Sequence, residues 1–334
     1  CVGAMINSRN LVNALIWLSR YSISNGSRFY KVVDMKLRLK IGISFCFIFY
    51  IILVLNNLEW ITNPRSAYMN REGLGVYWSI FATLIPICFI ISLSISKNLT
   101  AFGVVVKCFP FIFLGYFTGS KQTILSLILV SMFFTNYNIK KISFINGFLA
   151  GIVIVATFVI LLISQGAFGG LIDSFGYFDH NAVTASAIEY VKNKNIDPKI
   201  GENFISSLWS YAPRALFPDK PYAYGVLQLN NELFPGAAES GYTPAVYNWF
   251  SAYYDFREIG IVFGGLIEGL LLSSITHAYL KSKNTFIFVM LSGFAFLSFN
   301  MPTYMQGSIL SYLLLSNVSI IRKRRNSVLV KCSA

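Results

Sequence analysis

Runs of apolar residues alternate with short polar segments along most of the chain, and a single long polar segment, 165–257, interrupts the alternation. A helix that crosses the hydrocarbon core of a bilayer needs about 20 predominantly apolar residues. We therefore expect about eight membrane-spanning helices, at 41–56, 73–95, 101–118, 122–137, 143–164, 258–280, 285–299 and 307–321. The pattern predicts an all-α fold, a polytopic transmembrane bundle with one large, mainly helical loop.

The composition of the chain supports a membrane protein. The 334 residues are 55% hydrophobic and 12% charged, with a mean hydropathy of +0.60, which excludes a soluble domain of this length. The net charge of +13 would suggest a nucleic-acid partner in a soluble protein, but here the basic residues must first be assigned to a side of the membrane. None of the five cysteines lies in the long polar segment, so we expect no disulfide framework.

Basic residues are concentrated in alternate short segments between the apolar runs, as the positive-inside rule requires. The inside segments hold sixteen Lys and Arg residues, whereas the short outside segments hold only Arg65, Arg71 and Lys121. This distribution places both ends of the sequence in the cytoplasm and the loop at 165–257 on the outer face. It also removes the nucleic-acid interpretation.

This topology divides the chain into five parts. They are a cytoplasmic or interfacial segment at 1–40, a first transmembrane group at 41–164, the outer loop at 165–257, a second transmembrane group at 258–321 and a basic cytoplasmic tail at 322–334. The first residue is Cys rather than Met, so we expect the sequence to begin partway into a longer protein whose early spans are missing. The apolar patch at 11–18 is then either interfacial or the stub of a truncated span.

The outer loop is expected to form a small helical domain. Apolar residues at near-helical spacing predict an amphipathic helix over 181–195, with Asn181 as its N-cap. The positions on which this helix rests are Ala182, Ala185, Ile188, Tyr190 and Val191. A second helix is expected at 200–212, after which Pro213, Pro218 and Pro221 exclude regular helix.

The segment YAPRALFPDKPYAYG, 211–225, combines Arg214 and Lys220 with three prolines and three tyrosines, which suits a stiff, aromatic, cationic surface outside the membrane. Gly225 allows the backbone to turn at the end of this segment. Six further aromatic residues follow Tyr242 within 240–256. These rings either form the interfacial belt where the chain re-enters the membrane or stack against sugar rings.

These features resemble a known family. In a polytopic protein with a large outer loop, an Arg followed after ten residues by a Gly is similar to the Wzy-type O-antigen or oligosaccharide repeat-unit polymerases, and Arg214 and Gly225 have this spacing. GYTP at 241–244 and the Gly-rich return IGIVFGGLIEG add to the resemblance. The stretch TGSKQTIL, 118–125, looks like the Gly-Ser-Arg turn found ahead of a span in this superfamily, with Lys121 in place of Arg.

The resemblance implies an inverting, metal-independent glycosyltransferase of the multi-span C type in the bacterial inner membrane. Such an enzyme moves a growing glycan from undecaprenyl diphosphate onto the next lipid-linked repeat unit at the periplasmic face. A fixed guanidinium would stabilise the charge that develops on the departing diphosphate. We therefore assign this role to Arg214, with Lys121 and Lys220 as weaker second cations; the alternative for Arg214 is an ion pair with Asp219.

A general base must accept the proton of the acceptor hydroxyl. The candidates are His180, Asp179, Asp173 and Glu239, and the alternative for His180 is a solvated or helix-capping histidine. Further substrate contacts are expected from Tyr222, Tyr242, Glu239 and the Gly225 backbone. Asp179 and His180 alone do not make a metal site and the sequence has no His/Cys cluster, so we expect no metal or other cofactor.

The expected partners are the lipid-linked oligosaccharide as donor and acceptor, the lipid bilayer, and the chain-length regulator and flippase of the same pathway, with no nucleic acid. An O-antigen ligase is one alternative, but its loop typically has a His, ten residues and a Gly, whereas the residue at this distance from His180 is Val191. A flippase or other transporter is another. Transport predicts more charge along the spans and no need for a large outer loop.

Overall fold

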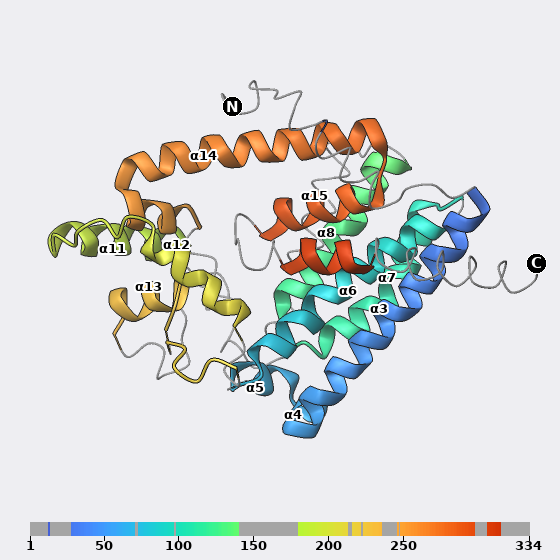
Figure 1. The fold of residues 1–334 in the computed structure, drawn as a ribbon, viewed down its shortest axis with the longest axis horizontal. Coiled ribbons are helices and arrows are strands. Elements are labelled where there is room, and N and C mark those ends of the chain that lie inside the picture. The colour runs from blue at the N-terminus through green and yellow to red at the C-terminus, as the bar shows by residue number, and fades with distance from the viewer. Residues whose placement is uncertain are drawn as a thin grey trace, which may run out of the picture. The chain divides into compact units, whose positions relative to one another are not determined.

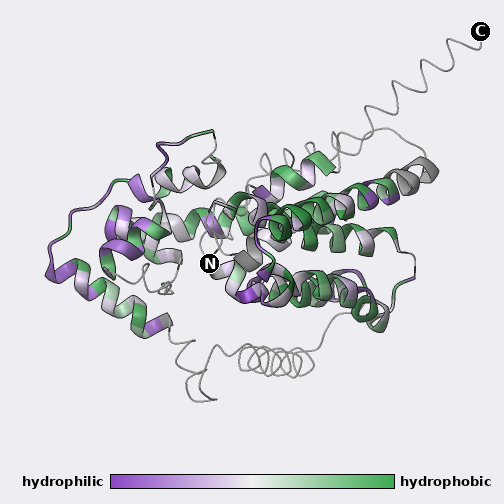
Figure 2. Cartoon of the chain, turned by 90° about the horizontal axis from the view of Figure 1, so that it is seen from below, coloured by the Kyte–Doolittle hydropathy of each residue, from purple (hydrophilic) through white to green (hydrophobic). Residues whose placement is uncertain are grey.

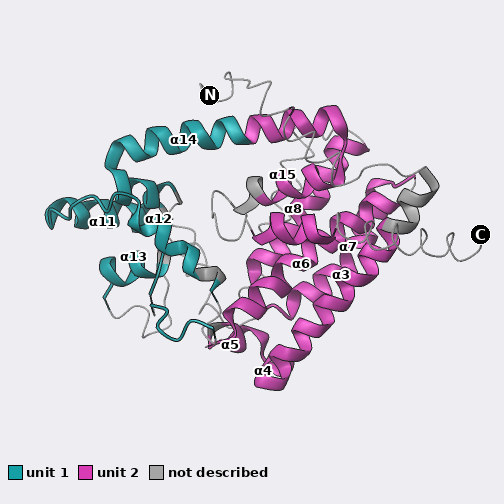
Figure 3. Cartoon of the chain, viewed as in Figure 1, with its two compact units in different colours: residues 1–6, 149–271, 298–302 teal, residues 7–148, 272–297, 303–334 magenta. Residues whose placement is uncertain are grey.

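The computed structural model describes residues 13, 28–70, 73–96, 98–139, 180–212, 216–221, 223–235, 246, 248–297 and 306–314. Within these ranges every regular element is a helix, so the predicted all-α class is confirmed (Figure 1). The chain divides into two compact units (Figure 3). Unit 1 comprises residues 1–6, 149–271 and 298–302, and unit 2 comprises residues 7–148, 272–297 and 303–334.

Unit 2 is a bundle organised around one very apolar helix. Its helices are α3 (Arg28–Asn56), α4 (Glu59–Thr62), α5 (Pro64–Met69), α6 (Gly75–Ile95), α7 (Ala101–Tyr116), α8 (Lys121–Asn138) and α15 (Thr285–Leu297), with a further helical stretch at 306–314. The central helix α6 packs against α3, α7, α8 and α15. Because α6 is apolar on all sides, it can be buried by neighbours on every face.

Three helices are long and apolar enough to cross a membrane, namely Met35–Asn56, Gly75–Ile95 and Trp249–Ser282, and the shorter Ala101–Tyr116 is also apolar. Figure 2 shows the helices of unit 2 as predominantly hydrophobic, whereas unit 1 mixes hydrophilic and hydrophobic residues. Helices also occupy the predicted runs at 122–137 and 285–299. The run at 143–164 lies outside the described residues, and the count of eight spans stays a prediction.

Unit 1 contains α11 (His180–Asn193), α12 (Glu202–Ser206), the 3-10 helix η1 (Ser207–Tyr211), α13 (Val226–Leu233) and helix α14 (Asn248–Ser282) as far as residue 271. The predicted helix at 200–212 is therefore present, with its second half wound more tightly. One hydrophobic core joins these helices. Its buried members are Ala187, Val191, Leu229, Leu233, Phe250, Tyr253 and Tyr254.

Helix α11 corrects two details of the prediction. The helix already begins at His180, so Asn181 lies inside it and is not the N-cap. Ala182 and Ala185 are exposed, and the buried face instead contains Thr184, Ala187 and Val191. The apolar spacing of the sequence was compatible with more than one helical face, and packing against α13 and α14 selects the face that is buried.

The aromatic residues near the end of the outer loop have a third role that the sequence did not suggest. Phe250, Tyr253 and Tyr254 belong neither to an exposed belt nor to a sugar-binding surface, because they are buried in the core of unit 1. Trp249 and Phe256 from the same stretch are exposed. Residues 248–256 are helical, so side chains three or four positions apart share a face: one face of this segment is buried and the other is exposed.

Candidate functional site

The turn Thr118–Ser120, which leads into Lys121 at the start of α8, is held by several hydrogen bonds. The buried Thr118 hydroxyl donates to the Gly115 carbonyl at 2.6 Å and accepts from the Ser120 amide at 3.2 Å. Gly119 has a φ of +61°, and a Cβ at this position would lie 2.1 Å from the Pro64 carbonyl oxygen. Only glycine fits at this position, because both the backbone conformation and the contact exclude a side chain.

Two side chains from other elements bind the same turn. The Trp78 indole at the start of α6 donates to the Thr118 carbonyl at 2.8 Å. The Arg65 guanidinium on α5 donates to the Gly119 carbonyl at 3.3 Å and lies 5.2 Å from the centre of the Tyr68 ring. The sequence indicated a role in anion binding for Lys121 but not for Arg65, and the fold brings the two residues to one turn.

Lys121 is almost fully buried, with 9% of its surface exposed. This residue is the first of α8 and precedes the predicted span at 122–137. Burial, and to a smaller extent the positive charge of Arg65, together lower the pKa of the Lys121 ammonium from its usual 10.5 to about 8. An anion placed beside these two cations would favour the charged form of Lys121, as phosphate-binding sites require.

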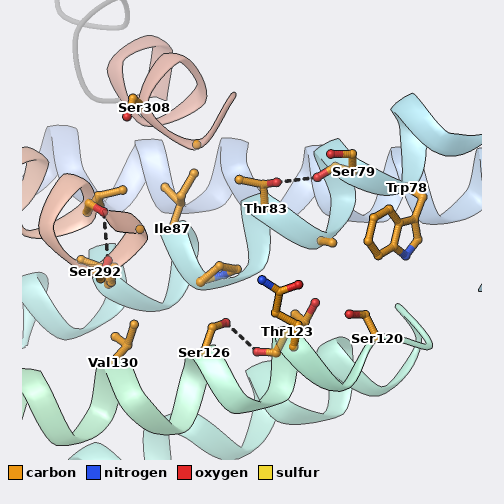
Figure 4. Close-up of a pocket in the computed structure, with 17 residues that line it drawn as sticks. Trp78, Ser79, Thr83, Ile87, Ser120, Thr123, Ser126, Val130, Ser292 and Ser308 are labelled. Carbon is orange, nitrogen blue, oxygen red and sulfur yellow. Dashed lines mark hydrogen bonds between the residues drawn. The ribbon is translucent and has the colours of Figure 1, made fainter. Parts of the chain in front are cut away.

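A cavity of about 120 Å³ lies next to this turn, between α6, α8, α15 and the helix at 306–314. Trp78, Ser79, Thr83 and Ile87 of α6 line it, together with Thr123, Ser126 and Val130 of α8 and Ser120 of the preceding turn (Figure 4). Ala82, Gly293 and Gly307 also line it. Small residues at these positions keep the helix surfaces apart without a side chain to fill the space.

Several hydroxyl groups of the cavity wall are already used as donors. Thr83 donates to the Ser79 carbonyl at 2.5 Å, Ser126 to the Thr123 carbonyl at 2.7 Å and Ser292 to the Val289 carbonyl at 2.9 Å. A hydroxyl carries one proton and two lone pairs, so these groups keep only the capacity to accept. The wall therefore suits a ligand that brings its own hydroxyl donors.

In unit 1 the loop that carries Arg214 is closed by Lys220. The Lys220 ammonium, which is 8% exposed, donates to the Ala212 carbonyl at 3.0 Å and lies 4.4 Å from the centre of the Tyr224 ring. Ala212 immediately precedes Pro213 and Arg214. Lys220 thus joins the two ends of the segment in which Arg214 lies, a positioning contact that the sequence did not indicate.

Gly225 ends this segment and begins α13. Its φ is +55°, and a Cβ would lie 2.9 Å from the Ser207 Cβ, so a side chain would collide with η1. The Gly225 amide donates to the Ser206 hydroxyl at 2.9 Å. The glycine of the Arg-to-Gly spacing is therefore required by the close approach of two segments.

The remaining predicted site residues are not placed by the structure. Arg214, Tyr222, Tyr242, Glu239, Asp173 and Asp179 lie outside the described residues. His180 is described only as the first residue of α11, without its side chain. The described residues contain no group of three or more His, Cys, Asp or Glu that could hold a metal ion.

A kink at Arg257 divides α14, and the hydrophobic pattern did not predict it. Arg257 has φ 58° and ψ −147°, a conformation that glycine adopts far more readily than arginine. Its guanidinium donates to the carbonyls of Tyr253 (3.4 Å), Tyr254 (3.3 Å) and Ile196. The contacts with Tyr253 and Tyr254 satisfy carbonyls that the end of the 248–256 helix would leave without donors, and the contact with Ile196 joins the kink to the segment after α11.

Asp255 connects the kinked helix to α12. Its buried carboxylate accepts from the amides of Asn203 at 3.2 Å and Phe204 at 3.1 Å, and its carbonyl accepts from the Ile200 amide at 3.0 Å. The first amides of a helix lack intrahelical partners, and a carboxylate satisfies them well. Asp255 therefore fixes where α12 begins relative to α14.

These observations define the class of the protein. It is a helical membrane protein with a buried cationic turn beside a hydroxyl-lined cavity in one unit, and a proline-rich loop closed by Lys220 in the other.

Its relatives make the assignment more specific. The chain is similar to the O-antigen polymerases of Salmonella typhimurium (strain LT2) and Salmonella typhi, with 27% identity over 256 residues in each case. The match covers 73% of this chain, and the chain spans about 60% of the length of these curated relatives. The resemblance to O-antigen polymerases predicted from the sequence is thereby confirmed. No protein-family model and no solved structure matches the chain.

Proposed function

We propose that the protein is an O-antigen or surface polysaccharide polymerase of the bacterial inner membrane. It transfers a growing glycan from undecaprenyl diphosphate onto the next lipid-linked repeat unit at the periplasmic face. The observation that carries this proposal is the similarity to two O-antigen polymerases over 73% of the chain. The cationic turn and the hydroxyl-lined cavity support it, because the reaction needs anion stabilisation and sugar binding in one protein.

The proposed step is a displacement at the anomeric carbon of the donor. The acceptor hydroxyl oxygen forms a bond to this carbon, while the bond from the carbon to the phosphate oxygen breaks and the lipid diphosphate leaves. The hydroxyl proton passes to a general base, for which His180 and Asp179 are the candidates. Attack from the face opposite the leaving group inverts the anomeric centre, and no metal is required if cationic side chains neutralise the diphosphate.

We assign the diphosphate clamp to Arg214, on a loop whose ends Lys220 joins. An arginine can bind two phosphate oxygens at once, and a loop with fixed ends limits the positions that it can reach. Tyr222, Tyr242 and Glu239 are proposed to contact sugars. Lys121, with Arg65 beside it, is proposed as a second anion site at the mouth of the cavity in unit 2.

The test is deletion of the gene in its host, followed by electrophoresis of the surface glycan. A product with a single repeat unit supports a polymerase. Glycan absent from the lipid A core would instead indicate a ligase, and lipid-linked units that accumulate in the cytoplasm would indicate a flippase.

Complementation with variants then tests the clamp. We expect Arg214→Ala to abolish the ladder of long chains at a normal protein level, and Arg214→Lys to restore it only in part, because lysine keeps the charge but not the two-point contact. Lys192→Ala, which removes an exposed cation from α11, is the matched control and should leave the ladder intact. A normal ladder with Arg214→Ala would remove Arg214 from the mechanism.

A further inference from the structure

Six large apolar side chains are exposed on two neighbouring segments of unit 1. We call this surface the apolar lip. Its members are Phe204, Ile205, Leu208, Trp209, Leu216 and Phe217, which are 36% to 73% exposed. The first four come from α12 and η1, and the rings of Trp209 and Phe217 meet edge to face at 6.2 Å. The two segments therefore form one surface.

Contacts within unit 1 fix the lip beside the start of a membrane-spanning helix. The carboxylate of Asp255 binds the first amides of α12, and a Cβ on Gly201 would lie only 3.2 Å from the ring of Phe256. Asp255 and Phe256 immediately precede the kink at Arg257. Helix α12, which carries part of the lip, therefore begins next to the kink of α14, just before the apolar part of α14.

Exposed apolar side chains are also present on α14. Beyond the kink, Ile259, Val262, Phe263 and Ile267 are exposed on a helix that is apolar enough to cross a membrane, where such side chains would face lipid. Two further exposed apolar residues lie close to the start of α12: Phe256, whose ring is next to Gly201, and Ile200, whose amide donates to the Asp255 carbonyl. Exposed apolar side chains are therefore found on the span, at the kink and on the lip.

The composition of the lip is that of a membrane interface. Residues 203–217 contain a single charged residue, Arg214, among Trp, Phe, Leu and Ile. Tryptophan and phenylalanine next to a span favour the boundary between lipid head groups and acyl chains. A contiguous exposed apolar surface in water would instead promote association.

We propose that the apolar lip is immersed in the lipid leaflet that α14 enters, at the boundary between head groups and acyl chains. The occupant of this surface is bilayer lipid. Lys220 and Ala212, which are described beside the lip, are then expected near the depth of lipid phosphates. The proposal concerns membrane contact alone and does not depend on the reaction that the protein catalyses.

Site-directed spin labelling of the full chain measures this contact directly. The five native cysteines are replaced by serine or alanine, and single cysteines are introduced as Ile205→Cys, Leu208→Cys and Leu216→Cys. The protein is reconstituted in vesicles of phosphatidylethanolamine and phosphatidylglycerol. Collision rates of the label with oxygen, which partitions into lipid, and with a water-soluble nickel chelate report its depth. Val262→Cys on the span and Glu189→Cys on the exposed face of α11 are the controls for lipid and water.

We expect the ratio of oxygen to nickel accessibility at 205, 208 and 216 to exceed that at 189 severalfold and to approach that at 262. A ratio equal to that at 189 would place the lip in water and overturn the proposal. Immobile labels shielded from both reagents would mean that protein covers the lip, which would also overturn it. Elution of each variant at the wild-type volume in size-exclusion chromatography checks its folding, and any one of the three positions suffices for the measurement.

Discussion

Lys121 and Arg65 are both cationic, yet the fold brings them to a single turn and buries one of them. Burial and the nearby Arg65 charge both disfavour the charged form of Lys121. The turn itself is held by hydrogen bonds to Thr118 and Gly119, one of which comes from Arg65. A bound anion would favour the charged form of Lys121, which is why we propose an anion site at this turn.

The charge of Lys121 should make activity depend on pH. With a pKa of about 8, lowered from 10.5, Lys121 is charged at pH 7 and loses its proton as the pH rises through about 8. We expect polymerisation by membranes supplied with lipid-linked repeat units to fall as the pH rises through that range, if Lys121 contacts the diphosphate.

Lys121→Arg is the matched variant, because arginine stays charged at every pH of the assay. It should extend activity to higher pH. The same alkaline loss in both proteins would show that another group is responsible, and the assignment of Lys121 would be wrong.

Gly119 is required for two separable reasons, and Gly73 provides the comparison. Both have positive φ, +61° and +73°, but a Cβ at 73 would meet nothing within 4 Å. Gly73→Ala should therefore cost about 1–2 kcal/mol from backbone conformation alone. Gly119→Ala adds a collision with the Pro64 carbonyl and should lower the thermal unfolding temperature in detergent much further. Equal losses in the two variants would refute the close approach of α5 to the turn.

At the scale of elements, the helices of unit 2 follow from local composition, whereas the features that bring the site together do not. Apolar runs predict helices because a span needs a continuous apolar segment, and helices occur at the runs that the structure describes. The contact of Arg65 with Gly119 and the cap by Asp255 join residues more than 50 positions apart in sequence, and the contact of Lys220 with Ala212 closes a loop between residues eight positions apart. Hydrophobic periodicity carries no information about such contacts.

The kink in α14 is a second feature that hydrophobic periodicity does not predict. An Arg before a Gly-rich apolar run is compatible with an uninterrupted helix, yet Arg257 adopts a conformation typical of glycine. A Cβ on Gly260 would lie 2.1 Å from the Ala252 carbonyl oxygen, so the two parts of α14 approach closely. Only the three carbonyls that the guanidinium binds explain why arginine occupies this position.

Two substitutions at Arg257 distinguish the effect of backbone strain from the effect of the lost guanidinium contacts. Arg257→Ala loses the guanidinium and keeps the unfavourable backbone, whereas Arg257→Gly loses the guanidinium and relieves the backbone by about 1–3 kcal/mol. We expect both variants to unfold at a lower temperature than the wild type, with Arg257→Ala the less stable of the two. If the glycine variant were equally or less stable, the backbone at 257 would not be strained.

At the scale of the whole molecule, two separate units carry the features that the proposed reaction requires. Unit 2 contains the cavity and the cationic turn, and unit 1 contains the loop with Arg214. The candidate catalytic residues could be predicted because the sequence resembles a known family, whose residue roles were carried over to matching positions. The cavity and Trp78 could not be predicted, because they arise where helices distant in sequence pack together.

Filling the cavity tests whether substrate enters it. Ala82 lines the cavity, and Ser94 is exposed on the same helix α6. We expect Ala82→Phe to shorten or abolish the glycan ladder while Ser94→Phe leaves it unchanged, at equal protein levels on an immunoblot. A normal ladder with Ala82→Phe would exclude the cavity as a substrate site.

The hydrogen bond from Lys220 to the Ala212 carbonyl joins the two ends of a loop, whatever residues lie between them. Because both ends are joined, changes at positions between them other than Arg214, Leu216 and Phe217 should leave the path of the chain on either side unchanged. If Arg214, Leu216 and Phe217 are kept, we expect replacement of the other residues between 212 and 220 by those of another polymerase to leave the protein folded.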